Sequence, residues 1–175
     1  KEGLLFKFDT GFYWYPNNNY PSQFAGTILD FYDDKSISKN GMLNKQKSYV
    51  LNKIELLREG HLRINEVFDF EKFALFFAIT DLWGNTHGVS LDNLKLYYNP
   101  ITLLVEPVGY DFQSIEYSSK LLSDNKQISR IENYSPKLLS ELQWPDIFFR
   151  DINFYKKYID YLAKISDHNF LDNFF

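Results

Sequence analysis

The amino-acid sequence predicts an α+β fold that is mainly helical and contains one β-hairpin. Two stretches with apolar residues at helical spacing predict helices, one from Asn44 and one after Asp69. Two strand-like runs on either side of Asn99-Pro100 predict the hairpin. The chain has 175 residues, the length of one domain, and a globular chain of this size buries roughly 70% of its unfolded surface. We therefore treat residues 1–175 as a single domain with its own core.

The first predicted element is a strand at Leu4–Phe8, where apolar and polar residues alternate. The first helix begins near Asn44 and has Lys and Glu on its polar side. Its apolar face consists of Val50, Ile54 and Leu57. Gly60 is placed to end this helix, because glycine adopts the left-handed conformation that terminates helices.

The second helix is predicted to begin after Asp69, whose side chain can accept hydrogen bonds from the free N–H groups of the first turn. Its apolar face consists of Phe70, Phe73, Ala74, Phe77 and Ala78. The next position at this spacing is Asp81. A carboxylate there faces the negative end of the helix dipole and loses hydration, so we expect a positive group to compensate it. The alternative is that Asp81 merely begins a surface loop with the help of Gly84.

The hairpin is predicted from Leu94, Leu96 and Tyr98, which alternate with polar residues, and from the β-rich run at 101–108. Asn93 precedes the first strand and Asp111 follows the second. Antiparallel pairing is therefore expected to bring these two residues to the same end of the hairpin. Asp92 is an alternative to Asn93, and the strand alternation does not decide which of the two faces a metal.

The C-terminal part is predicted to be helical scaffold without chemistry of its own. Pro145 suits the first turn of one helix. The apolar side of the last helix consists of Phe154, Tyr158, Tyr161, Leu162 and Ile165.

Composition excludes several classes of protein. Aromatic residues make up 19% of the chain, which argues against disorder and for a core rich in Phe and Tyr. The net charge of −4 is spread without a basic stripe, so nucleic acid is not expected as a partner. The longest apolar run, 73–79, is too short to span a membrane. There is no cysteine, which excludes disulfides and thiolate metal sites but leaves the compartment open.

The predicted site suits phosphoryl transfer. Asn93 and Asp111 offer oxygen ligands for Mg²⁺ or another hard divalent cation, and Asp81 could accept a proton from an incoming hydroxyl. Protein kinases use this order: a loop Asp, a downstream Asn, a hairpin and then an Asp-Phe metal ligand. An ordinary protein kinase is excluded, because Asp81 and Asn93 are 12 positions apart and Gln113 stands where glycine would follow Asp-Phe.

Four segments together resemble the spore coat protein H (CotH) kinase family: LNKIELLREG, FDFEKFALFFAITDLWGNTH, DNLKLYYNP and EPVGYDF. The resemblance spans roughly residues 1–115 and implies an atypical protein-kinase-like fold, with ATP as co-substrate and Ser hydroxyls of proteins as acceptors. By position, it implies that Asp81 is the catalytic acid/base, Asn93 a metal ligand and Asp111 the metal-binding Asp. For location, it points to a cell-surface, secreted or spore-associated protein of bacteria.

The resemblance also implies that this chain is the C-terminal lobe of such a kinase. The N-terminal lobe, with the nucleotide-binding lysine, would precede Lys1, and we expect the chain alone not to phosphorylate anything efficiently.

Other functions fit the sequence less well. A non-catalytic kinase relative, acting as a surface module, could bind a protein or glycan through the Tyr- and Asn-rich loop at Tyr13–Tyr20. Glu106 or Glu116 could join Asp81 or Asp111 as a glycosidase-type carboxylate pair, which has no support beyond the abundance of acids. Trp83 is expected to pack under the loop that follows it.

Overall fold

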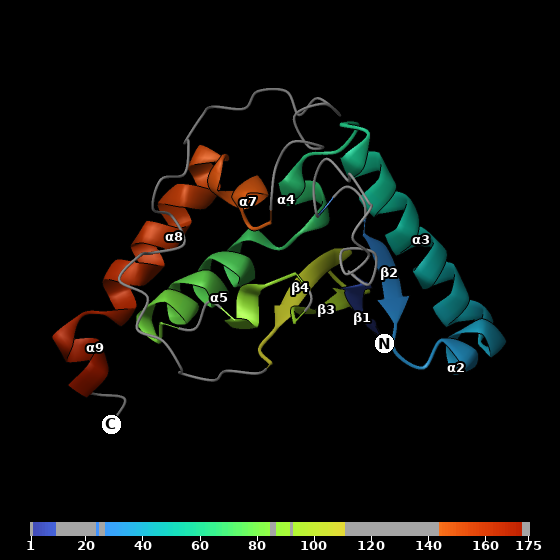
Figure 1. Cartoon of the computed structure of the whole chain (residues 1–175), viewed down its shortest axis with the longest axis horizontal. Helices are drawn as coiled ribbons and strands as arrows, with labels where there is room; N and C mark the ends of the chain where they lie inside the picture. The colour runs from blue at the N-terminus through green and yellow to red at the C-terminus, as the bar shows by residue number, and fades with distance from the viewer. Residues whose placement is uncertain are drawn as a thin grey trace, which may run out of the picture.

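The computed structural model describes residues 2–9, 24, 27–84, 87–91, 93–110 and 144–172. These residues form helices and a four-stranded antiparallel sheet, which confirms the α+β prediction. In Figure 1 the strands lie between α3 on the right and α5 with α8 on the left. Asp111, Asp92, Glu116, the loop Tyr13–Tyr20 and the side chain of His87 lie outside the description.

The sheet has the strand order β2-β1-β3-β4, so the N-terminal strand lies inside the sheet. Its strands are β1 (Leu4–Asp9), β2 (Ile28–Phe31), β3 (Lys95–Asn99) and β4 (Leu104–Val108). The predicted strand and the predicted hairpin are confirmed, whereas β2 was not predicted. Successive side chains of β1 and β3 alternate between the core and the opposite face, and the buried set is apolar, as expected for strands with one buried side.

The hairpin turn is organised by Asn99, whose Oδ1 accepts a hydrogen bond from the Ile101 N–H at 2.8 Å. The register pairs Lys95 with Val108. This pair ends the ladder on the side opposite the turn, so the chain entering β3 and the chain leaving β4 lie at the same end of the sheet, as the sequence predicts.

Helix α3 (Gly41–Arg58) carries the predicted buried face and begins slightly earlier than expected. Asn40 caps it, because its Oδ1 accepts hydrogen bonds from the N–H groups of Met42 at 3.0 Å and Leu43 at 3.2 Å. Gly60 has a φ of 76° and ends the helix as predicted. The short helix α2 (Asp34–Lys39), which precedes α3, was not predicted.

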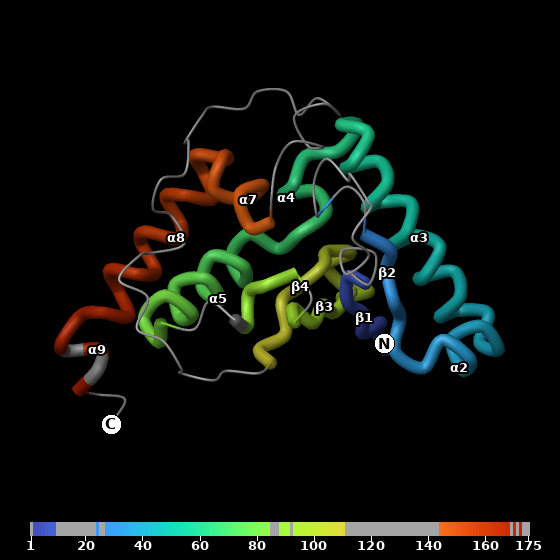
Figure 2. Tube along the Cα trace, viewed as in Figure 1, coloured from blue at the N-terminus to red at the C-terminus, as the bar shows by residue number. Residues whose placement is uncertain are grey.

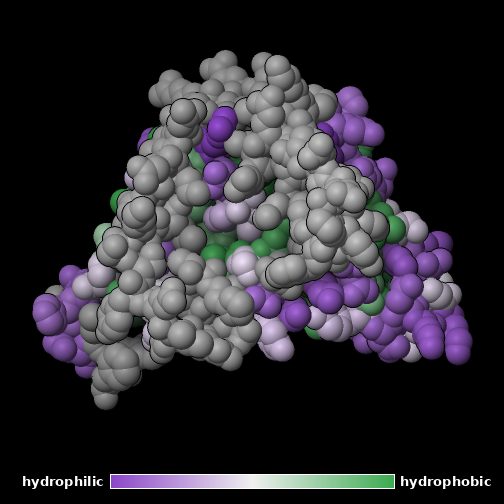
Figure 3. Space-filling model, in the orientation of Figure 1, coloured by the Kyte–Doolittle hydropathy of each residue, from purple (hydrophilic) through white to green (hydrophobic). Residues whose placement is uncertain are grey.

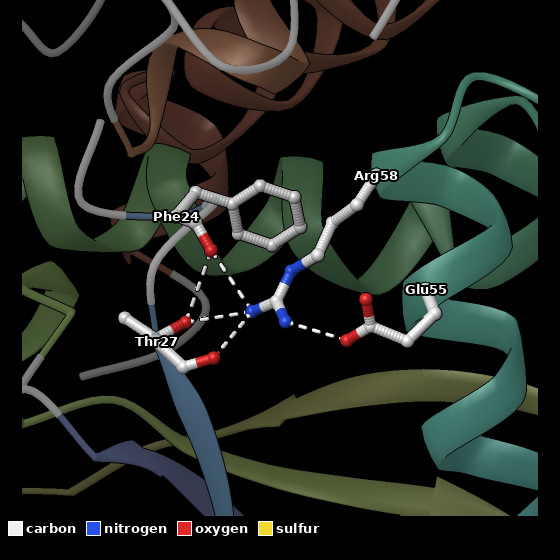
Figure 4. Close-up of polar contacts among 4 residues, drawn as sticks. All are labelled: Phe24, Thr27, Glu55 and Arg58. Carbon is white, nitrogen blue, oxygen red and sulfur yellow. Dashed lines mark hydrogen bonds and ion pairs between the residues drawn. The ribbon is translucent and has the colours of Figure 1, made fainter. Parts of the chain in front are cut away.

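Arg58, the last residue of α3, fastens the helix to the beginning of β2, as Figure 4 shows. Its Nη2 donates to the carbonyl oxygens of Phe24 at 2.9 Å and Thr27 at 2.7 Å, and lies 2.9 Å from Thr27 Oγ1. Its Nη1 donates to Glu55 Oε1 at 2.7 Å. One guanidinium thereby satisfies backbone acceptors of a segment more than 30 positions away.

Helix α5 (Phe70–Leu82) follows the short helix α4 (Ile64–Val67) and begins at the edge of β4. Asp69 caps it as predicted, with Oδ1 accepting from the Lys72 N–H at 3.2 Å. The Asp69 N–H in turn donates to the Val105 carbonyl at 2.9 Å. The start of α5 is therefore fixed to the hairpin.

The C-terminal helices are α7 (Asp146–Phe149), α8 (Ile152–Ile165) and α9 (His168–Asp172). Pro145 lies just before α7, close to the predicted place. Helix α8 packs along α5, and the trace in Figure 2 shows the two running side by side. The predicted apolar side of α8 is confirmed for Phe154, Tyr158 and Ile165, which are buried.

The core is dominated by aromatic side chains, as the composition predicts. Phe73 of α5 stacks on Phe148 of α7 with ring centroids 4.6 Å apart, and Trp144 packs edge-on against Phe148 at 5.1 Å. Figure 3 shows hydrophilic side chains over α2 and α3, and apolar surface in the middle of the same face. Among the described helices, none is long and apolar enough to cross a membrane.

Candidate functional site

Asp81 lies in the last turn of α5, at the position that the apolar spacing predicts, and its side chain is half-buried. Its carboxylate Oδ2 accepts a short hydrogen bond from the hydroxyl of Tyr158. Tyr158 comes from α8 and is fully buried, with its ring edge-on to Phe149 at 5.1 Å. Asp81 is therefore part of the contact between two helices rather than the beginning of a surface loop.

This contact changes the expected role of the C-terminal helices. The sequence predicts only a scaffold role for them, yet α8 supplies a direct partner to the carboxylate of Asp81. The signal was present in the choice of Tyr at position 158, because a buried tyrosine hydroxyl needs a hydrogen-bond partner and phenylalanine does not. The Tyr158 hydroxyl is one partner of Asp81, and the positive group expected to compensate this carboxylate stays a prediction.

Asn93 lies in the turn between η2 (His87–Val89) and β3. Its side-chain Nδ2 donates to Ser90 Oγ at 3.2 Å, and its backbone N–H donates to the Ser90 carbonyl at 3.0 Å. The amide nitrogen is thus directed toward Ser90, which turns the amide oxygen the other way. This donation orients the side-chain amide of Asn93.

The segment that carries Asn93 is held in place by a hydrogen bond from the buried side chain of Trp144. Trp144 is buried, and its Nε1 donates to the Val89 carbonyl at 3.0 Å. Val89 and Leu91 are themselves buried. Because Trp144 also packs against Phe73 of α5, one side chain contacts both the helix that carries Asp81 and the segment that carries Asn93.

A second anchor joins α5 to the hairpin. Glu106 of β4 is nearly buried, and its Oε2 lies 2.7 Å from Lys72 Nζ of α5. Its Oε1 accepts a hydrogen bond from Asn99 Nδ2 at 2.7 Å. These partners explain how a carboxylate can be buried here, and they occupy Glu106 in a structural network rather than in a glycosidase-type pair.

The three predicted site residues are therefore located only in part. The structure describes Asp81 and Asn93. After β4 it describes the chain only as far as Tyr110, so Asp111 is not described. Within the described residues, which include neither Asp111 nor Asp92, no three His, Asp or Glu side chains gather in a way that could hold a metal ion. The convergence of the three residues stays a prediction.

Trp83 does not pack under the following loop, so that expectation was wrong. Its side chain is 55% exposed, and the neighbouring Leu82 is 42% exposed. Trp83 follows the last residue of α5, Leu82, as the C-cap of the helix. Gly84, with a φ of 65°, then turns the chain away.

Comparison with known proteins adds no relative. No family model, curated protein or solved structure matches this chain. The resemblance to the CotH kinase family therefore stays a prediction from the quoted sequence segments.

Proposed function

We propose that this chain is the C-terminal lobe of an atypical protein kinase similar to the CotH family, transferring phosphate from ATP to Ser hydroxyls of proteins. In this proposal Asp81 is the catalytic acid/base, and Asn93 and Asp111 hold Mg²⁺ or another hard divalent cation. The observation that carries the proposal is the hairpin register, which brings the chain entering β3 and the chain leaving β4 to the same end of the sheet.

The donors fit a hard cation. Asn93 offers an amide oxygen whose orientation is fixed by the donation from Nδ2 to Ser90, and Asp111 offers a carboxylate. When bound, the metal would neutralise charge on the transferring phosphate. The protein's own contribution is to hold these oxygens at the mouth of a hairpin that Glu106 and Lys72 tie to α5.

Asp81 acts in this proposal on the acceptor hydroxyl. As general base it would take the proton of a Ser hydroxyl as the phosphoryl group arrives. The hydrogen bond from Tyr158 restricts the rotation of the Asp81 carboxylate.

The test combines binding with transfer. We expect ATP to raise the melting temperature only when Mg²⁺ is present, and Asp111→Ala to abolish this effect. In a longer form of the protein that includes an N-terminal lobe, Asp81→Ala should lose phosphoryl transfer and keep ATP binding. Transfer that survives Asp81→Ala would remove the acid/base assignment, and stabilisation that survives Asp111→Ala would remove the metal assignment.

A second candidate is a non-catalytic relative that binds a protein or glycan at its surface. The exposure of Trp83 beside Leu82 favours it, because exposed aromatic and apolar side chains often mark binding surfaces. Under this alternative, Trp83→Ala would abolish binding to a glycan array or a surface-protein extract, and Mg²⁺ with ATP would not change the melting temperature.

A further inference from the structure

Two lysines face each other on the side of the sheet opposite the core. The register pairs Lys7 of β1 directly with Lys95 of β3, and directly paired residues of antiparallel strands project from the same face. Both alternate with buried neighbours, which confirms that they point away from the core. Like charges at directly paired positions repel each other, so this pair destabilises the sheet unless a negatively charged group lies between the two ammonium groups.

The surroundings of the pair offset this repulsion only in part. Lys7 Nζ lies 3.6 Å from the carboxylate of Asp30, which is a loose and exposed ion pair. Lys95 Nζ lies over the rings of Tyr110 at 4.5 Å and Tyr32 at 5.5 Å. These rings are 53% and 40% exposed, so the cluster opens to solvent.

The pair also lies close to the proposed metal site. Lys95 follows Asn93 by two residues, a separation of at most about 7 Å between the two backbones. Tyr110, which contacts Lys95, immediately precedes Asp111. A polyphosphate that reached a cation at the hairpin mouth would therefore extend its next phosphate group toward these two lysines.

We propose that Lys7 and Lys95 bind the polyphosphate chain of the nucleotide. This inference rests on the proposed function and adds to it the phosphate contacts within this lobe. Each ammonium group donates to phosphate oxygens, and the bound anion removes the repulsion between the two lysines. Affinity without metal should be modest, because Asp30 and Asp9 lie on the same face and partly offset the positive charge.

The probe is inorganic tripolyphosphate in EDTA, titrated into the 175-residue chain at low ionic strength and followed by amide NMR shifts. We expect shifts at Lys7, Lys95 and the neighbouring Tyr32 and Tyr110. Lys7→Gln and Lys95→Gln should each weaken binding about tenfold or more, since each removes a charge-assisted contact. The affinity for ATP in the same buffer should fall by a comparable factor in each variant. This would show that the two lysines bind the phosphate groups that ATP and tripolyphosphate share.

Two further variants separate a site from a general charge effect. Lys156→Gln on the exposed side of α8 removes the same charge at a distance and should leave binding unchanged. Asp30→Asn should tighten binding several-fold, because it releases Lys7 from its carboxylate. Equal weakening by Lys156→Gln, shifts confined to other regions, or no binding of tripolyphosphate at all would each overturn the proposal. Because the titration contains no metal, its outcome is independent of whether Mg²⁺ with ATP stabilises the protein.

Discussion

The Tyr158 hydroxyl donates a hydrogen bond to the Asp81 carboxylate and so joins α8 to the last turn of α5 across 77 positions of sequence. Removing this hydroxyl tests the contact with little change in volume. We expect Tyr158→Phe to lower the free energy of unfolding by about 1–2 kcal/mol, because a half-buried carboxylate loses a donor that water replaces only in part. Urea titration measures this loss.

Tyr155→Phe is the matched control, since Tyr155 lies on the same helix with its ring centroid 6.3 Å from that of Tyr158. It should change stability by only a few tenths of a kcal/mol, roughly as a surface substitution does. Equal effects of the two variants would mean that the hydrogen bond to Asp81 contributes nothing specific.

A second link between the same helices should depend on pH. Lys157 of α8 donates to Glu71 of α5, which lowers the pKa of Glu71 below its usual 4.5 and raises the pKa of Lys157 above its usual 10.5. Because the folded-state pKa of Glu71 is depressed, its contribution to stability is present above pH 4.5 and is lost as the pH falls below that value. Both side chains are exposed by more than a third, so the contribution at neutral pH should stay below about 1 kcal/mol.

The measurement compares Glu71→Gln with wild type in urea at several pH values. The stability difference should be constant between pH 6 and 9, roughly the range between the two titrations, and shrink toward zero in acid. Glu2→Gln, at an exposed position outside this contact, should show no such pH dependence. A difference that grows on acidification would contradict the assigned direction.

Glu106 should show how strongly the hairpin depends on its buried carboxylate. Glu106→Ala leaves Asn99 Nδ2 and Lys72 without their acceptor, and we expect it to cost roughly 1–3 kcal/mol of unfolding free energy. Glu106→Gln keeps an oxygen acceptor for Asn99 and loses only the charge, so it should cost less. If the two variants were equally destabilised, the hydrogen bond to Asn99 would be irrelevant and the ion pair with Lys72 would dominate.

Two glycines should respond in opposite ways to alanine. A Cβ at Gly3 would lie 2.2 Å from the Tyr98 carbonyl oxygen and 2.4 Å from Cζ of Tyr97, so β1 would have to move away from β3. We expect Gly3→Ala to lower the free energy of unfolding by about 1–3 kcal/mol.

A Cβ at Gly41, the first residue of α3, would meet nothing within 4 Å, and Gly41→Ala should leave the free energy of unfolding unchanged or raise it by up to about 1 kcal/mol. Thermal unfolding of the two variants beside wild type measures whether each substitution lowers or raises the stability of the protein.

The elements that the sequence predicts are those with local signals. Asp69 predicts the start of α5, because an N-cap residue and the apolar period after it lie within one or two turns of the helix. Gly60 predicts the end of α3, because its left-handed conformation is also a property of the local chain. The turn at Asn99 likewise fixes the hairpin. Pairings between distant segments lack such signals, so β2 and its place beside β1 were missed.

The candidate site shows the same division. The position of Asp81 on the inner side of α5 follows from spacing alone, but its partner Tyr158 could not be assigned, because periodicity shows that a ring is buried and not what its hydroxyl meets. Trp83 is predicted to pack under the following loop, but it is the C-cap of α5 and is exposed.

The central position of β1 constrains the order in which the protein can assemble. Leu4 pairs with Tyr98, a residue 94 positions away, while β3 and β4 are joined by a short turn. Helices and the hairpin can form from neighbouring residues, but the sheet closes only when the remote N-terminal segment enters between β2 and β3, and such distant closures are slow. Until then both of those strands keep an unpaired edge, so the nascent sheet is exposed to misassociation with other chains.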